Sequence, residues 1–336
     1  MKKLIAAAVA ASMSAVATAD VSITGNANYE YFHKTDGGAT EVTSNYGDME
    51  VNVSIVGKTG NTSVVANLEI DEAGDAAANT GIDVEDLYIT TQVAGINVKA
   101  GDFASGTTAL GGEIDDGRRA VNKIDLSTNI GSAKVGYATS QSGNAFNNDA
   151  AAVYASIPVA GMTLGIKDES DAYTIVGLSG EMNGINFRIE NKDMDAANSD
   201  TLFYQVGTKL GDVSISVEGI DADTSELVEE DDSAIFAQEM GDTTSGNNTG
   251  KDNVDGVSQV TLATSVDGTA VKFRAGTLQG TAGKQDADFF RVEASRPLAS
   301  GATLTVSYDD YEDAGVAVGS AKYDTQLLEI DLAVKF

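Results

Sequence analysis

The sequence predicts an all-β chain that folds into a closed antiparallel transmembrane β-barrel of 16 or 18 strands. Apolar and polar residues alternate with a period of two along most of the chain. Short glycine-containing connections alternate with longer polar ones. After the N-terminal segment, no stretch carries the run of about 18 apolar residues that a spanning helix needs. Strands of about ten residues, with tight turns at one end and longer loops at the other, are typical of outer-membrane barrels.

The period of two is clearest at the C-terminus, where residues 328–336 place an apolar side chain at every second position. Such a strand has one apolar face and one polar face. No comparable helical periodicity follows residue 19. The same alternation recurs at residues 21–31, 49–55, 64–70, 96–100, 185–190, 213–218, 271–275 and 304–308.

Eight short connections separate these strands, and each contains a glycine that can supply the positive φ of a tight hairpin turn. Both prolines fall in these connections, which we expect to lie outside any ladder. Eight hairpins with a first and a last strand give 18 strands, or 16 if a blurred pair near residues 82–92 and 172–180 is misread. The connections are residues 58–61, 93–95, 129–132, 158–161, 181–184, 210–212, 266–268 and 297–301.

The first 19 residues have the pattern of an export signal. Two lysines precede an apolar run at residues 4–11, and Ala-Thr-Ala at residues 17–19 supplies the small residues of a cleavage site. An N-terminal helix of the folded protein is the alternative, but the run is too short to span a bilayer. We therefore expect residues 1–19 to be a signal peptide and residues 20–336 to form the barrel.

Composition excludes several classes of chemistry. The chain has 336 residues, 21 Lys and Arg against 51 Asp and Glu, a net charge of −30, one His and no Cys. Nucleic-acid binding needs clustered basic residues, so we expect no nucleic-acid partner. Without Cys there is no thiolate nucleophile, zinc ribbon or iron–sulfur cluster. We expect no cofactor and no metal site.

An enzyme and a soluble protein remain as alternatives. A membrane hydrolase would need an activated Ser or a carboxylate–His pair; the single histidine is His33 and no G-x-S-x-G elbow is present, so we expect no catalysis. A secreted or surface β-sandwich, such as an adhesin or structural protein, would bury its apolar faces between two sheets. The alternation of connection lengths and the aromatic C-terminus, Phe336, favour the barrel.

The sequence resembles the general diffusion porins of Gram-negative outer membranes. The matching features are the Ala-Thr-Ala end of the signal, the opening strand at residues 21–25, Gly-Asp-Phe at residues 101–103 followed by a long loop and residues 118–124, and the final Phe336. The resemblance spans residues 20–336, mostly as pattern.

This resemblance implies a homotrimer in the cell outer membrane, in contact with its lipids and lipopolysaccharide, that lets ions and small hydrophilic solutes diffuse passively. It implies assembly by the barrel-assembly machinery through the C-terminal strand and Phe336. It further implies that the loop after the fifth strand, residues 104–117, folds into the lumen as a constriction. Family porins commonly have 16 strands and face this loop with basic residues on the first strands; here residues 20–92 contain only Lys34 and Lys58.

Strand parity places most charged residues on the inner face, because a charge facing lipid at mid-membrane costs about 2–4 kcal/mol. An excess of carboxylates in a narrow aqueous passage concentrates cations, so we expect a weakly cation-selective channel. Either Lys99, Lys123 and two arginines oppose the loop acids across the constriction, or the arginines neutralise Asp115 and Asp116 within the loop. The expected constriction residues are Glu113, Asp115, Asp116, Arg118, Arg119, Lys99 and Lys123.

Two further features carry expectations. Residues 221–255 form the longest acidic stretch without a strand pattern, which predicts a solvated external loop or a divalent-cation site that bridges to lipopolysaccharide phosphates. Aromatic residues near strand ends predict interfacial belts. The candidates are Tyr29, Tyr31, Tyr137, Phe187, Tyr204, Phe273, Phe290, Tyr308 and Phe336.

Overall fold

The computed structural model describes most of the chain after residue 19. The expected signal peptide (residues 1–19) and constriction loop (residues 104–117) lie outside the described residues, as does most of the acidic stretch. The described residues are 20–37, 41–72, 81–103, 120–139, 141–142, 145–146, 151–170, 172–195, 199–223, 254–312, 318, 320–321 and 324–336.

Eighteen strands form one antiparallel sheet. A separate two-stranded hairpin, β8 (Gln141–Ser142) and β9 (Ala145–Phe146), comes after β7 and before β10 along the chain. The strands of the large sheet are β1 (Asp20–Asp36), β2 (Val42–Thr59), β3 (Thr62–Glu72), β4 (Gly81–Val93), β5 (Ile96–Phe103), β6 (Ala120–Ile130), β7 (Ala133–Thr139), β10 (Ala152–Val159), β11 (Met162–Glu169), β12 (Tyr173–Met182), β13 (Ile185–Met194), β14 (Asp200–Leu210), β15 (Val213–Ala222), β16 (Val254–Val266), β17 (Thr269–Gly280), β18 (Ala287–Pro297), β19 (Ala302–Glu312) and β20 (Asp324–Lys335).

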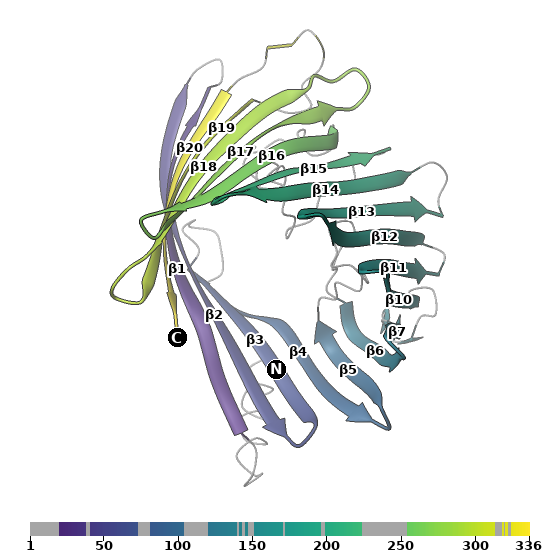
Figure 1. Cartoon of the computed structure of the whole chain (residues 1–336). Helices are drawn as coiled ribbons and strands as arrows, with labels where there is room; N and C mark the ends of the chain where they lie inside the picture. The colour runs from purple at the N-terminus through teal and green to yellow at the C-terminus, as the bar shows by residue number, and fades with distance from the viewer. Residues whose placement is uncertain are drawn as a thin grey trace.

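The sheet closes on itself because β1 pairs with both β2 and β20. Figure 1 shows the result as a ring of strands, with β1 in purple beside the yellow-green strands of the C-terminal end. The higher of the two expected strand counts is therefore confirmed, and the β-sandwich alternative is wrong, because one closed sheet replaces two packed ones. Within the described part of the chain, no helix is long and apolar enough to cross a membrane.

The eight short turns lie where the sequence predicts them, and each contains a residue with positive φ. In Asn183-Gly184 and Asp267-Gly268 both central residues have positive φ, as a type I′ turn requires. The expectation for the prolines is wrong. Pro158 pairs with Thr163 inside β10, and Pro297 ends β18 opposite Thr303, so both belong to ladders but lie close to strand ends.

The two faces of the sheet differ as the sequence predicts. Large apolar side chains point away from the barrel axis and are exposed, for example Ile23, Ile89 and Val217. The register pairs them with one another across neighbouring strands, as for Val217 and Val260. All nine aromatic candidates for interfacial belts share this outward parity.

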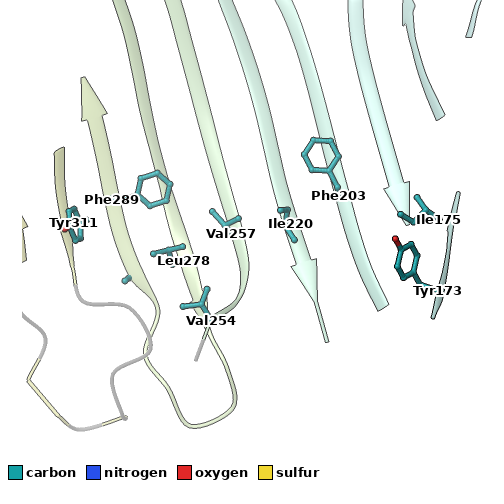
Figure 2. Close-up of a cluster of buried hydrophobic side chains, with 10 residues drawn as sticks. Tyr173, Ile175, Phe203, Ile220, Val254, Val257, Leu278, Phe289 and Tyr311 are labelled. Carbon is teal, nitrogen blue, oxygen red and sulfur yellow. The ribbon is translucent and has the colours of Figure 1, made fainter. Parts of the chain in front are cut away.

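An apolar cluster lines the inner face near the end of the barrel that carries the long connections. Figure 2 shows its side chains in a row across successive strands, from Tyr173 and Ile175 on β12 to Tyr311 on β19. Phe203 and Val257, near the middle of the row, are almost completely buried. This part of the inner face is therefore apolar, although the period of two predicts one apolar and one polar face for each strand. The other members are Ile220, Val254, Leu278, Ala287 and Phe289.

Candidate functional site: the barrel interior

The inner face of β20 and β1 to β4 is acidic, and we call it the acidic wall. Its centre is a row in which Asp331, Glu30 and Asp48 lie directly opposite one another on three adjacent strands. The first strands thus carry mainly acids on their inner face. The carboxylates of the acidic wall are Glu329, Asp331, Glu30, Asp36, Asp48, Glu50, Glu69, Asp83 and Asp86.

Four of these carboxylates form no ion pair among the described residues. The carboxylates of Glu329, Asp331, Asp48 and Glu50 all act electrostatically on Glu30. Among the ion pairs that the described residues form, none includes Glu30, Asp48, Glu50 or Asp331. The lysines of the acidic wall form no ion pair with these four carboxylates. Lys34 is buried and bonded to Asp36 (3.0 Å), and Lys58 and Lys335 lie towards the tight-turn end.

On the inner face of β11 to β19, several basic residues are held in ion pairs, and we call these strands the paired wall. Lys167 lies 3.4 Å from Glu169, and Arg188 lies 2.6 Å from Glu190. Arg291 contacts Glu329 at 3.2 Å and Asp309 at 3.6 Å, so it also links β18 to β20.

In the middle of the paired wall lies a buried carboxylate whose described partners are neutral. Glu218 on β15 accepts hydrogen bonds from Gln205 Nε2 (2.7 Å), Gln259 Nε2 (2.7 Å) and Thr261 Oγ1 (2.9 Å). Such donors compensate a buried carboxylate because each bond to an ionised oxygen is stronger than a neutral one. The network ties β14, β15 and β16 together.

Two of the predicted constriction residues are described, and both touch aromatic rings. The Lys99 Nζ atom lies 3.9 Å from the ring centroid of Tyr88 and 4.0 Å from that of Phe103. Lys123 lies 5.6 Å from the same Phe103 ring. Sequence reasoning noted Phe103 only as part of a motif and missed its role as a cation–π partner. The inward parity of Tyr88 was the signal that could have revealed the cluster.

The other constriction candidates lie outside the described residues: Glu113, Asp115, Asp116, Arg118 and Arg119. An electric field between them and the two lysines therefore stays a prediction. In the described part, Lys99 faces Asp125 in the register of β5 and β6. Lys99 is thus held between two rings beside a carboxylate, at the point where β5 leads into the expected loop.

The C-terminal Phe336 lies at the seam of the barrel. Its N–H donates to the carbonyl of Gly25 (3.0 Å), and its carbonyl accepts from the Gly25 N–H (2.9 Å). The ring covers Gly25 so closely that an added Cβ there would lie 2.6 Å from the ring. Phe336 therefore completes the pairing of the first and last strands, whatever its part in assembly.

The single histidine lies away from the interior. His33 has outward parity on β1, and its Nδ1 lies 2.5 Å from Asn45 Oδ1, which also accepts from the Tyr31 hydroxyl at 3.1 Å. No carboxylate is part of this arrangement. Within the described ranges, no three His, Asp or Glu side chains are grouped so that they could hold a metal ion.

Comparison with known proteins places the fold among outer-membrane porin barrels. No protein-family model matches the chain, and no curated protein does. Pseudomonas aeruginosa OccK9 (OpdG) is similar in structure, with a TM-score of 0.61 and 12% identity over 94% of this chain and 99% of that one. P. aeruginosa OpdO has a TM-score of 0.60 and 12% identity over 94% and 97%. A mutant of the Rh. blastica porin has a TM-score of 0.52 and 13% identity over 94% and 100%.

Proposed function

We propose that this protein is an outer-membrane porin through which ions and small hydrophilic solutes diffuse passively. The observation that carries the proposal is the division of one closed sheet into two faces. The outward face exposes aliphatic and aromatic side chains that suit a lipid environment. The inward face carries most of the charged residues of the strands. The structural neighbours, which include a porin and a P. aeruginosa outer membrane protein, support the same reading.

We further propose a weak cation preference, caused by the uncompensated carboxylates of the acidic wall. On the paired wall, Lys167, Arg188 and Arg291 each lie within 4 Å of a carboxylate, so these opposite charges largely cancel at a distance. Glu30, Asp48, Glu50 and Asp331 have no such cancellation. Low-dielectric walls around them concentrate cations along this side of the passage.

Conductance of the purified protein in planar bilayers tests both parts. Stepwise current increases are expected in symmetric KCl, and a KCl gradient should give a reversal potential of the sign for K⁺ preference. A Glu30→Gln, Asp48→Asn, Glu50→Gln variant should lose most of that potential while it keeps its conductance. Absence of current steps from correctly folded protein would refute the channel, and a Cl⁻ preference would refute the selectivity argument.

The remaining parts of the proposal rest on the sequence pattern and on the resemblance. We propose that residues 1–19 are removed on export and that residues 104–117 constrict the channel. The expected acidic loop at residues 221–255 is shorter at both ends, because β15 extends to Ala222 and β16 begins at Val254; we propose that the stretch between these strands is an external loop. A homotrimer, contact with lipopolysaccharide, and delivery by the barrel-assembly machinery through Phe336 belong to the same proposal. Catalysis is not part of it, since His33 has outward parity and its described partner is an amide.

A further inference from the structure

A stacked aromatic pair lies on the inner face beside the uncompensated carboxylates. Phe32 on β1 and Tyr46 on β2 are opposite each other in the ladder. Their ring centroids are 4.7 Å apart and their planes differ by 19°. Both share the inward parity of Glu30 and Asp48, which lie two residues away on the same strands. Tyr46 is 44% exposed, so the pair presents an accessible aromatic surface to the interior.

Five other inward aromatic rings already have a basic side chain of this protein over them. Within the described part of the chain, the rings of Phe32 and Tyr46 have no such cation. The position that a lysine or arginine occupies elsewhere is thus left open here. The contacts elsewhere are Lys99 with Tyr88 and Phe103, Lys134 with Tyr154, Lys167 and Lys192 with Tyr173, and Arg188 with Phe203.

The electrostatic surroundings of the pair favour a positive ligand. The carboxylates of Glu30 and Asp48, which form no ion pair among the described residues, act electrostatically on the Tyr46 hydroxyl group. Glu329 and Asp36 act on it as well, but their charges are offset by Arg291 and Lys34. In the adjacent row, the buried Asp331 Oδ1 atom has no hydrogen-bond partner. A ring face attracts a cation through its quadrupole, and nearby carboxylates add to that attraction.

We propose that Phe32 and Tyr46, with Glu30 and Asp48, form a binding subsite for small alkylated ammonium ions on the path through the barrel. The subsite rests on the proposed channel function, because the ligand reaches it from water inside the barrel. Aromatic surface distinguishes these ions from K⁺, because alkyl groups weaken hydration and pack against rings, whereas K⁺ is bound through oxygen atoms.

Tetramethylammonium is the probe for a single-channel experiment in KCl. Added to the wild-type channel, it is expected to reduce the K⁺ current in a saturable manner. Neopentyl alcohol, which is similar in size but uncharged, should leave the current unchanged. Tyr46→Leu is expected to raise the half-blocking concentration roughly fivefold, because it removes one cation–π contact at a partly exposed site. Asp48→Asn should raise it as well, and more at low ionic strength.

Tyr29→Leu is the matched control, because Tyr29 lies on the same strand with outward parity; its block should equal that of the wild type. Heat-modifiable electrophoretic mobility shows which variants are folded, and Phe32→Leu replaces Tyr46→Leu if the latter fails. Equal block in the wild type and the folded aromatic variant would overturn the subsite, as would normal K⁺ current without any block. Loss of all current in the folded wild type would instead overturn the channel.

Discussion

We expect the hydrogen-bonded carboxylate of Glu218 to contribute measurably to the free energy of unfolding of the barrel. Glu218 is 3% exposed and Gln259 is 2% exposed, so the network is shielded from bulk water. Glu218→Gln keeps the size and shape of the side chain. It removes the negative charge and brings an NH₂ group towards three donors, from Gln205, Gln259 and Thr261.

The expected loss follows from the three bonds. A hydrogen bond to a charged group contributes about 1.5–3 kcal/mol and a neutral one about 0.5–1.5 kcal/mol. Weakening the bonds therefore costs about 1 kcal/mol each, and rotation of the donor groups to meet the new NH₂ limits further loss. The smaller desolvation cost of a neutral side chain offsets part of this. We expect the free energy of unfolding to fall by roughly 2 kcal/mol.

Urea-induced unfolding in lipid vesicles, followed by far-ultraviolet circular dichroism, measures this change. Glu181→Gln is the matched control, since Glu181 is exposed near the tight-turn end of β12, and it should change the stability by less than about 0.5 kcal/mol. A Glu218→Gln variant as stable as the wild type would refute the reasoning, because desolvation of the charge would then outweigh the bonds it accepts.

Two more predictions use the same unfolding measurement. Arg188→Met leaves Glu190, which is 0% exposed, without its 2.6 Å ion pair and should cost roughly 3–5 kcal/mol. Arg188→Met combined with Glu190→Leu should recover most of that loss; a double variant no more stable than the single one would contradict the pairing argument. Deletion of Phe336 removes both hydrogen bonds to Gly25 and should cost roughly 2 kcal/mol, whereas Phe336→Ala keeps them and should cost less. An equal fall in the free energy of unfolding of the two Phe336 variants would show that the ring, and not the main-chain hydrogen bonds, stabilises the pairing of β1 and β20.

The strands and turns could be predicted because their pattern is local, and the two blurred strands have identifiable causes. The register of β3 and β4 shifts next to Asn67, so the outward parity changes between Val84 and Leu87. On β12, Tyr173 and Ile175 belong to the inner apolar cluster while Val176 is exposed on the outward face. Both faces are apolar there, and a period of two is no longer visible.

The interior could be predicted only in part, because its electrostatics depend on which strands are neighbours. The inward parity of Glu30 and Asp331 was readable from the sequence, but they lie opposite each other only because β1 pairs with β20. Likewise, the ion pair of Arg291 with Glu329 crosses from β18 past β19 to β20. Closure of the barrel decides which carboxylates have a basic partner, and the local sequence pattern does not show this.

The difference between the paired wall and the acidic wall determines where the barrel interior must contain water or cations. An ionised carboxylate in a dry interior is very costly unless a cation or several donors compensate it. Glu190 and Glu218 meet that condition through Arg188 and three neutral donors. Glu30 and Asp48 do not meet it through a basic side chain, because neither forms an ion pair among the described residues. They can stay charged only if water or mobile cations reach the acidic wall, so the residues that would give the channel its selectivity also require it to be wet.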